Sequence, residues 1–243
     1  MQTPKISRTS TLVSFSGIDG AGKSTLIANL IAHLEQSGLR VRLITFWDDV
    51  ARLKFLREGA GHTLFKGDKG VGTPEAPIQR RDKNVRSPLM TLVRLALYAI
   101  DAVSLRRVVK RAMRSDAHVV IFDRYMYDEL ANLNLRNPAM RAFARTIMML
   151  VPRPEPGFVI DTDPAQAHAR KPEYPLDFLY SNRESYLKLA QILDGITVLP
   201  NTYLERAKAD VVTEVMHRLP PPGASDGATN QSAESEVRGV VTR

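Results

Sequence analysis

The stretch FSGIDGAGKSTL, from Phe15 to Leu26, holds the residues of this chain whose spacing most clearly suggests chemistry. It fits the pattern G-x4-G-K-S and follows an apolar run. In such a loop the backbone N–H groups turn inward around phosphate oxygens. The lysine reaches the β- and γ-phosphates, and the serine hydroxyl holds Mg²⁺. A chance glycine-rich turn would not be expected between an apolar strand and an amphipathic helix. We therefore predict a triphosphate cradle at the protein surface, formed by Gly17, Asp19, Gly20, Ala21, Gly22, Lys23, Ser24 and Thr25.

A second pair of candidates, Asp123 and Arg124, ends the apolar run VVIF. The carboxyl ends of strands are where α/β sheets bind ligands. A carboxylate there can hold Mg²⁺, directly or through water. An arginine can donate two parallel hydrogen bonds to a phosphate or carboxylate. An isolated Asp-Arg pair would be read as a structural ion pair, but beside a phosphate loop a functional role is favoured.

Basic residues around a polar break form a third candidate group. Arg170 and Lys171 begin the run RKPEYP, and Arg183 follows it. Lids of phosphoryl-transfer enzymes carry arginines that close on the transferring group. Composition alone favours a basic surface turn instead.

Two acids, Asp48 and Asp49, follow the second apolar run beside Trp47, the single tryptophan of the chain. They should face the same sheet edge as the phosphate loop. There one of them could accept a proton from a substrate hydroxyl or hydrogen-bond a substrate sugar. A solvated acidic turn, with Trp47 as a packing residue, is an equally good interpretation.

Five short apolar runs predict the strands that must position these residues, at 12–16, 41–46, 118–122, 158–162 and 196–199. Helical spacing of apolar residues predicts helices between them, the last one capped by Asn201. The helical region 128–150 is interrupted near Asn137-Pro138. Strand, glycine loop, helix, strand is a βαβ unit, which implies a parallel sheet. We therefore predict an α/β three-layer sandwich with a five-stranded parallel sheet flanked by helices.

The length of 243 residues and the hydrophobic content of 44% suit one globular domain. We expect a flexible N-terminus over 1–11, the domain over 12–219 and a disordered tail over 220–243, where few large apolar residues occur. The irregular segment 59–86 is either functional or disordered.

The chain has no cysteine and no apolar run as long as a membrane span. We therefore expect a cytoplasmic protein without disulfides or thiolate metal sites. The net charge of +8 fits nucleic acid or phosphate-rich small ligands. Nucleic acid is the less favoured partner, because the basic residues cluster near the predicted phosphate sites and no pattern of stacking aromatics appears.

Together these residues resemble thymidylate kinase and related P-loop nucleoside and nucleotide kinases. The specific part is GIDGAGKST at 17–25 with DRY at 123–125, and the segments 97–112 and 176–190 are similar to helices of that family. The resemblance implies ATP and Mg²⁺ as cofactors and a sheet order of 2-3-1-4-5. It implies that Asp19 contacts the acceptor sugar, Arg124 binds the acceptor phosphate, Asp123 serves Mg²⁺, and Arg170 or Arg183 acts from the lid. It also allows for a homodimer.

Three departures from the family pattern all lie on the acceptor side. Where relatives have E-P-G-G after the second strand, this chain has Trp47-Asp48-Asp49-Val50. An arginine that usually follows the aspartate matching Asp101 is replaced by Ala102, and an Ala-Tyr-Gln stretch becomes Leu130-Ala131-Asn132. The donor side is intact, so the departures concern the identity of the acceptor.

We expect Mg-ATP-dependent phosphoryl transfer to a nucleoside monophosphate, with dTMP first by resemblance. A kinase of a nucleoside or another hydroxyl-bearing metabolite is the alternative, because nucleoside kinases of the family carry an acid near Asp48. A P-loop NTPase or a non-catalytic ATP-binding regulator is a further alternative, although the N-K-x-D run of GTPases is absent. The catalytic candidates are Lys23, Arg124, Arg170, Arg183 and Asp48, and the metal candidates are Ser24 and Asp123.

Overall fold

The computed structural model of the protein describes residues 10–50 and 88–219. Five strands form one parallel sheet in the order β2-β3-β1-β4-β5, which confirms the predicted sheet and its strand order. Each strand lies within one residue of its predicted bounds at either end. The strands are β1 (Thr11–Ser16), β2 (Val41–Thr45), β3 (Val119–Asp123), β4 (Gly157–Asp161) and β5 (Ile196–Pro200).

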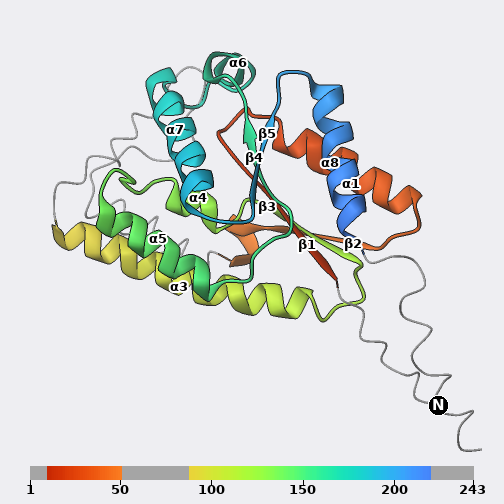
Figure 1. Ribbon diagram of the computed structural model, residues 1–243, viewed down its shortest axis with the longest axis horizontal. Helices are drawn as coiled ribbons and strands as arrows, with labels where there is room; N and C mark the ends of the chain where they lie inside the picture. The colour runs from red at the N-terminus through yellow and green to blue at the C-terminus, as the bar shows by residue number, and fades with distance from the viewer. Residues whose placement is uncertain (1–9, 51–87, 220–243) are drawn as a thin grey trace, which may run out of the picture.

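Helices cover both faces of the sheet and complete the predicted three layers (Figure 1). On one face lie α1 (Lys23–Gln36) and α8 (Leu204–Arg218). The other face carries α3 (Pro88–Ala112), α4 (Met126–Leu130), α5 (Pro138–Leu150) and α7 (Leu176–Ile192). The short α6 (Pro164–Arg170) packs beside α7, and a single π-helical turn, η1 (Phe46–Val50), follows β2.

Burial along the strands follows their place in the sheet. The central strand β1 pairs with both β3 and β4, and its residues from Leu12 to Ser16 are buried. The edge strand β2 exposes Arg42 and Leu43. Parallel strands covered by helices on both faces have continuous apolar runs, which is why their positions could be predicted from the sequence.

The ends of several helices also follow local sequence signals. Asn137 accepts a hydrogen bond from the N–H of Ala139 at 2.9 Å, with Pro138 as the first helical residue. This cap separates α4 from α5 at the predicted break. α1 ends before Gly38, whose φ of +75° suits a glycine.

The prediction that Asn201 caps the last helix is wrong. α8 begins only at Leu204, and the residue before it, Tyr203, makes no side-chain cap hydrogen bond. Asn201 is 3% exposed, and its side chain contacts the phosphate loop instead. A polar residue after a strand is therefore ambiguous, because it can serve either a helix or a ligand loop.

Several predictions fall outside the described residues: most of the N-terminus over 1–11, all of the irregular segment 59–86, and the tail over 220–243. Among the helices that the structure describes, none is both long and apolar enough to cross a membrane.

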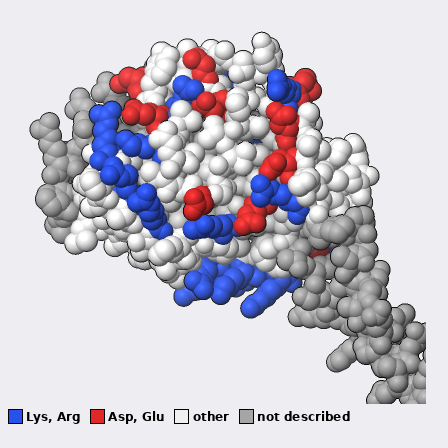
Figure 2. All heavy atoms as spheres, viewed as in Figure 1, with Lys and Arg blue, Asp and Glu red and all other residues white. Residues whose placement is uncertain are grey.

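The expected gathering of basic residues at the phosphate sites holds only in part. The C-terminal half of α3 ends at the amino edge of the sheet, opposite the phosphate loop, and exposes Arg106, Arg107, Lys110 and Arg111. Figure 2 shows Lys and Arg side chains gathered along the lower edge of the molecule in this view. These cations serve no phosphate site that the sequence predicts.

Candidate active site

The phosphate loop connects β1 to α1 and depends on glycine at two tightly packed points. Gly20 has φ of +80° and Gly22 has φ of +93°, a region that residues with a Cβ adopt reluctantly. A Cβ on Gly20 would lie 2.2 Å from the carbonyl oxygen of Ala167 on α6. A Cβ on Gly22 would lie 2.7 Å from Nδ2 of Asn201. The loop therefore needs glycine for its conformation and for close contact with the segments that follow β4 and β5.

Lys23 is buried, contrary to the expectation of a surface cradle. Its relative exposure is 7%, and its Nζ donates to the carbonyl oxygens of Gly17 and Ile18, each at 2.8 Å. Burial, together with the nearby charge of Arg124, lowers the pKa of Lys23 to about 8, although carboxylates led by Asp19 oppose the shift. The amine thus lies folded into its own loop, in a place where a charged group is costly. By contrast, Ser24 and Thr25 are exposed at the start of α1.

The Ala21 carbonyl of the loop is held by two residues that sequence reasoning missed. Thr162 donates its hydroxyl to this oxygen at 3.2 Å, and Asn201 donates from Nδ2 at 2.6 Å. Both donors are 3% exposed. Because a trans peptide points its C=O and N–H in opposite directions, fixing the Ala21 oxygen inward turns the Gly22 N–H to the other side. The one signal in the sequence is a polar residue directly after each of two strands.

Arg124 lies next to the phosphate loop in an unusual backbone conformation. Its φ is +68°, and its N–H donates to the carbonyl oxygen of Phe15 at 2.9 Å. Left-handed conformations of residues other than glycine are uncommon and gather at functional sites. The guanidinium pairs with Asp19 of the loop and, through Nη1 at 3.1 Å, with Asp128. The sequence-predicted residues Asp19 and Arg124 are therefore brought together.

Asp123 lies at the same edge of the sheet. It is the last residue of β3 and pairs in register with two residues of the flanking strands: Phe15, the second-last residue of β1, and Thr45, the last residue of β2. Burial raises the pKa of Asp123, and the positive charges of Lys23 and Arg124 offset that only in part. For Asp19 the balance is reversed: burial raises its pKa, but Arg124 and Lys23 outweigh burial and leave the pKa lowered.

The predicted metal residues fit a magnesium ion that is bound largely through phosphate. Ser24 lies in the first turn of α1 after the phosphate loop, and Asp123 ends β3 at the carboxyl edge of the sheet. Both supply oxygen ligands of the kind that Mg²⁺ prefers. Among the residues that the structure describes, no group of three or more His, Cys, Asp or Glu could hold a metal ion alone. Mg²⁺ needs no such group, since it commonly uses one or two protein oxygens, substrate phosphates and water.

The two lid candidates have different partners. Arg170, at the end of α6, donates to the carbonyl oxygen of Gly20 in the phosphate loop at 3.4 Å. Arg183, on α7, makes a bidentate pair with Asp161 at the end of β4, with one contact at 2.9 Å. Lys171 pairs with Glu173 at 3.1 Å. Of these three, Arg170 is the one that hydrogen-bonds the loop, and Lys171 lies close enough to help lower the pKa of Asp19.

The two acids after β2 also differ. Asp49 accepts the N–H of Thr45 at 2.9 Å, so it closes the turn of η1. Trp47 packs edge-on against Phe46 with ring centroids 5.3 Å apart, as the packing interpretation expects. Both Asp48 and Asp49 are exposed.

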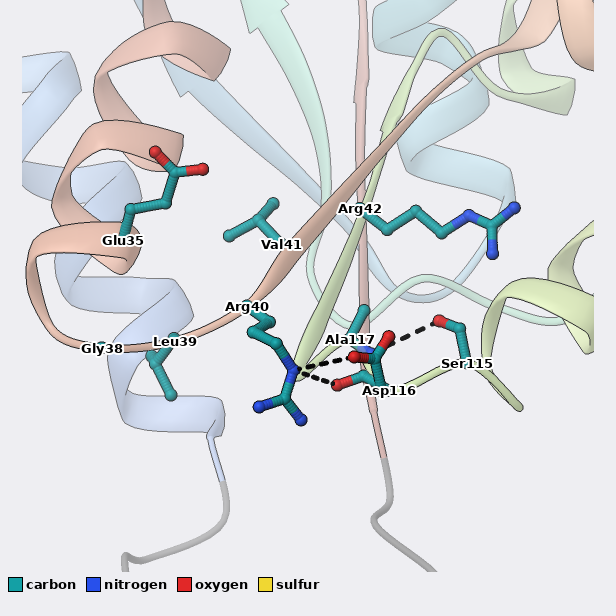
Figure 3. A pocket seen from close by; sticks show the side chains of 9 residues that line it. All are labelled: Glu35, Gly38, Leu39, Arg40, Val41, Arg42, Ser115, Asp116 and Ala117. Carbon is teal, nitrogen blue, oxygen red and sulfur yellow. Dashed lines mark hydrogen bonds and ion pairs between the residues drawn. The ribbon is translucent and has the colours of Figure 1, made fainter.

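A hollow of about 570 Å³ lies away from all of these residues, between the end of α1 and the starts of β2 and β3 (Figure 3). Arg40 crosses it to the backbone oxygen of Asp116 at 2.9 Å and to its carboxylate at 3.2 Å. This hollow is at the amino edge of the sheet and has no part in the phosphate site.

Comparison with known proteins gives this geometry a context. No model of a known protein family matches the chain. The chain is 26% identical over 204 residues to a probable thymidylate kinase of Methanosphaera stadtmanae, covering 82% of this chain and 94% of the relative. It is 26% identical over 210 residues to a probable thymidylate kinase of Archaeoglobus fulgidus, covering 82% and 92%. A probable thymidylate kinase of Pyrobaculum aerophilum is 28% identical over 223 residues, covering 85% and 96%.

The chain is therefore similar to thymidylate kinases. The similarity runs through nearly the whole length of these relatives. The resemblance predicted from the phosphate loop and the Asp-Arg-Tyr run is confirmed.

Proposed function

We propose that this thymidylate kinase-like protein transfers the γ-phosphoryl group of Mg-ATP to dTMP and forms dTDP. One observation carries the proposal: the complete phosphate loop lies against an arginine, Arg124, that is fixed at the same sheet edge by Asp19 and by its own backbone. A donor site and a cation suited to an acceptor phosphate thus stand side by side. The relatives named thymidylate kinase support dTMP as that acceptor.

The roles follow from the chemistry of phosphoryl transfer, in which positioning and positive charge do most of the work. Lys23 would leave the carbonyls of Gly17 and Ile18 and bind the β- and γ-phosphates, whose charge keeps its ammonium protonated. Arg124 would hold the acceptor phosphate, and Arg170 would close from α6 over the transferring group. Ser24 and Asp123 would hold Mg²⁺, which supplies charge neutralisation to the phosphate oxygens.

No general base is required by this scheme. The attacking oxygen belongs to an acceptor phosphate, which is already ionised near neutral pH. The acid Asp48 is then left to hydrogen-bond the acceptor or to remain in solvent.

A second candidate function, transfer to the hydroxyl of an uncharged nucleoside, is favoured by the charges around Arg124. Three carboxylates (Asp19, Asp123 and Asp128) lie close to two cations, the buried Lys23 and the partly buried Arg124. A dianionic acceptor gains less from Arg124 when two of these carboxylates already share it. An uncharged acceptor has no such penalty, and Asp48 could take its proton.

Two variants and two acceptors separate the proposals. The wild-type protein, Asp48→Asn and Asp49→Asn are each assayed with Mg-ATP and either dTMP or thymidine. Because Asp49 closes the η1 turn, its variant is the matched control for a merely structural effect. We expect the wild type to prefer dTMP and Asp48→Asn to keep measurable transfer to it. Transfer to thymidine alone, abolished in Asp48→Asn and retained in Asp49→Asn, would replace the monophosphate proposal with the nucleoside one.

A further inference from the structure

Asp128 is a buried carboxylate with a full set of hydrogen-bond donors. It lies on the short helix α4, is 4% exposed, and accepts four hydrogen bonds. Its Oδ2 receives the Ser16 hydroxyl at 2.5 Å and the Tyr125 N–H at 3.0 Å. Its Oδ1 receives Nη1 of Arg124 at 3.1 Å and the Tyr186 hydroxyl at 2.8 Å. A buried charge is tolerated only when it is satisfied in this way.

These four donors come from three parts of the site. Ser16 is the last residue of β1, directly before the phosphate loop. Tyr125 and Arg124 belong to the turn that follows β3. Tyr186 is buried on α7, the helix that follows the basic break and also carries Arg183. Asp128 therefore joins the loop, the arginine and the helix behind the lid.

Arg124 depends on carboxylates for its orientation. Its side chain is 22% exposed, and among the residues that the structure describes it hydrogen-bonds only Asp19 and Asp128. Asp19 lies in the phosphate loop, and its side chain is 20% exposed, whereas that of Asp128 is 2% exposed. Asp128 lies in a packed helix and is fixed by three further donors. Asp128 is thus the rigid one of the two anchors.

We propose that Asp128 is a positioning residue for Arg124: it fixes the guanidinium for the acceptor phosphate, and Tyr186 ties this anchor to α7. The role in transfer rests on the proposed function, but the fixing of Arg124 does not. The alternative is a purely structural role, in which Asp128 only caps α4, since it accepts the N–H of Tyr125 at 3.0 Å. The two interpretations differ in what a substitution should change.

The substitution Asp128→Asn keeps the size of the side chain but cannot keep its bonding. An amide has one acceptor oxygen and one NH₂ donor. Whichever way it turns, a donor faces either Arg124 or the Tyr125 N–H, and the negative charge that attracts the guanidinium is lost. Tyr186→Phe is gentler, because it removes one donor and leaves the carboxylate in place.

The first measurement is steady-state kinetics with Mg-ATP and dTMP. We expect Asp128→Asn to lower kcat/KM for dTMP by about 10- to 100-fold, the range for misplacing a group that orients a substrate. Equilibrium affinity for ATP should stay within about threefold, because the ATP cradle is made by the loop and α1. Tyr186→Phe should have a smaller effect of the same kind. Asn137→Ala, which removes the cap of α5, is the control: it should lower the melting temperature without changing kcat/KM for dTMP.

The second measurement needs no activity. The side-chain Nε–H of Arg124 is observed by NMR in ¹⁵N-arginine-labelled protein and assigned by its loss in Arg124→Lys. We expect a rigid, slowly exchanging signal in the wild type and in Asn137→Ala, and a mobile, rapidly exchanging one in Asp128→Asn. If the wild type phosphorylates no acceptor, the proposed function fails and this signal still decides the role of Asp128.

An unchanged Arg124 signal in Asp128→Asn would overturn the proposal, as would unchanged kcat/KM with only a lower melting temperature. If Asp128→Asn does not fold, Tyr186→Phe carries the test. A rigid Arg124 signal and unchanged kinetics in that variant would then refute the link to α7.

Discussion

Replacing Lys23 by methionine should abolish transfer and yet make the ligand-free protein more stable. In the structure the ammonium is 7% exposed, and burial, with Arg124 nearby, lowers its pKa from 10.5 to about 8. At about 1.4 kcal/mol per pH unit, the charged amine is disfavoured by about 3 kcal/mol relative to water. Methionine is unbranched, fits the same space and carries no charge.

Part of that gain is lost, because the carbonyls of Gly17 and Ile18 lose their donor, at about 1 kcal/mol each. We therefore expect Lys23→Met to raise the free energy of unfolding by about 1 kcal/mol at pH 7. For a chain of this size that corresponds to about 2–4 °C in melting temperature. ATP should no longer stabilise the variant. Urea unfolding with and without Mg-ATP measures both effects, and Lys110→Met, at an exposed position of α3, is the control.

The pH dependence gives the prediction its sharpest form. Between about pH 8 and 10.5 the unfolded chain holds the Lys23 proton more tightly than the folded one, so wild-type stability gains from rising pH. Lys23→Met lacks this gain. The advantage of the variant should therefore be largest below pH 8 and shrink toward pH 10.5. A variant less stable than the wild type at pH 7, or a gap that does not close with pH, would refute the view that the empty loop carries a costly buried charge.

Three further predictions concern the same site. Gly20→Ala should lower the free energy of unfolding in urea melts by about 2 kcal/mol or more, because the new Cβ would meet the backbone of α6. Gly38→Ala is the control: its φ is similar but nothing lies within 4 Å of the new Cβ, so it should lower the free energy of unfolding by only about 1 kcal/mol. Equal losses would argue against tight packing of α6 on the loop. Arg170→Ala should lower kcat by at least about tenfold with little change in the KM for ATP, whereas Arg183→Ala should mainly lower the melting temperature because its partner is a carboxylate of the protein. The reverse pattern would assign the lid role to Arg183. Finally, kcat/KM for ATP should fall as pH rises through about 8, when Lys23 loses its proton in the free protein, while kcat should stay level over that range; parallel profiles would contradict this.

The fold follows from local patterns that the sequence displays openly. Central parallel strands are continuous apolar runs, and glycine or a capping residue marks the helix ends, as at Gly38 and Asn137. The phosphate loop and the Asp-Arg pair are equally local, and so they too could be predicted.

The supports of the site could not be predicted, because they depend on residues far apart in the chain. Thr162 is 141 residues from the Ala21 oxygen that it holds, and Asn201 is 180 residues from it. In the sequence Asp128 looks like an ordinary acidic residue of a helix, and its hydrogen bond with Ser16 appears only in the folded structure. The burial of Lys23 likewise follows from packing rather than from its motif. Spacing along the chain identifies the reacting groups, whereas only packing reveals what orients them.

The most direct test of the central claim is transfer of label from γ-³²P-ATP in the presence of Mg²⁺ and dTMP, with Lys23→Met as the inactive control. We expect labelled dTDP as the main product, formed much faster than inorganic phosphate and not formed by the variant. Release of the label only as inorganic phosphate would contradict this expectation, as would binding of ATP without transfer to either dTMP or thymidine.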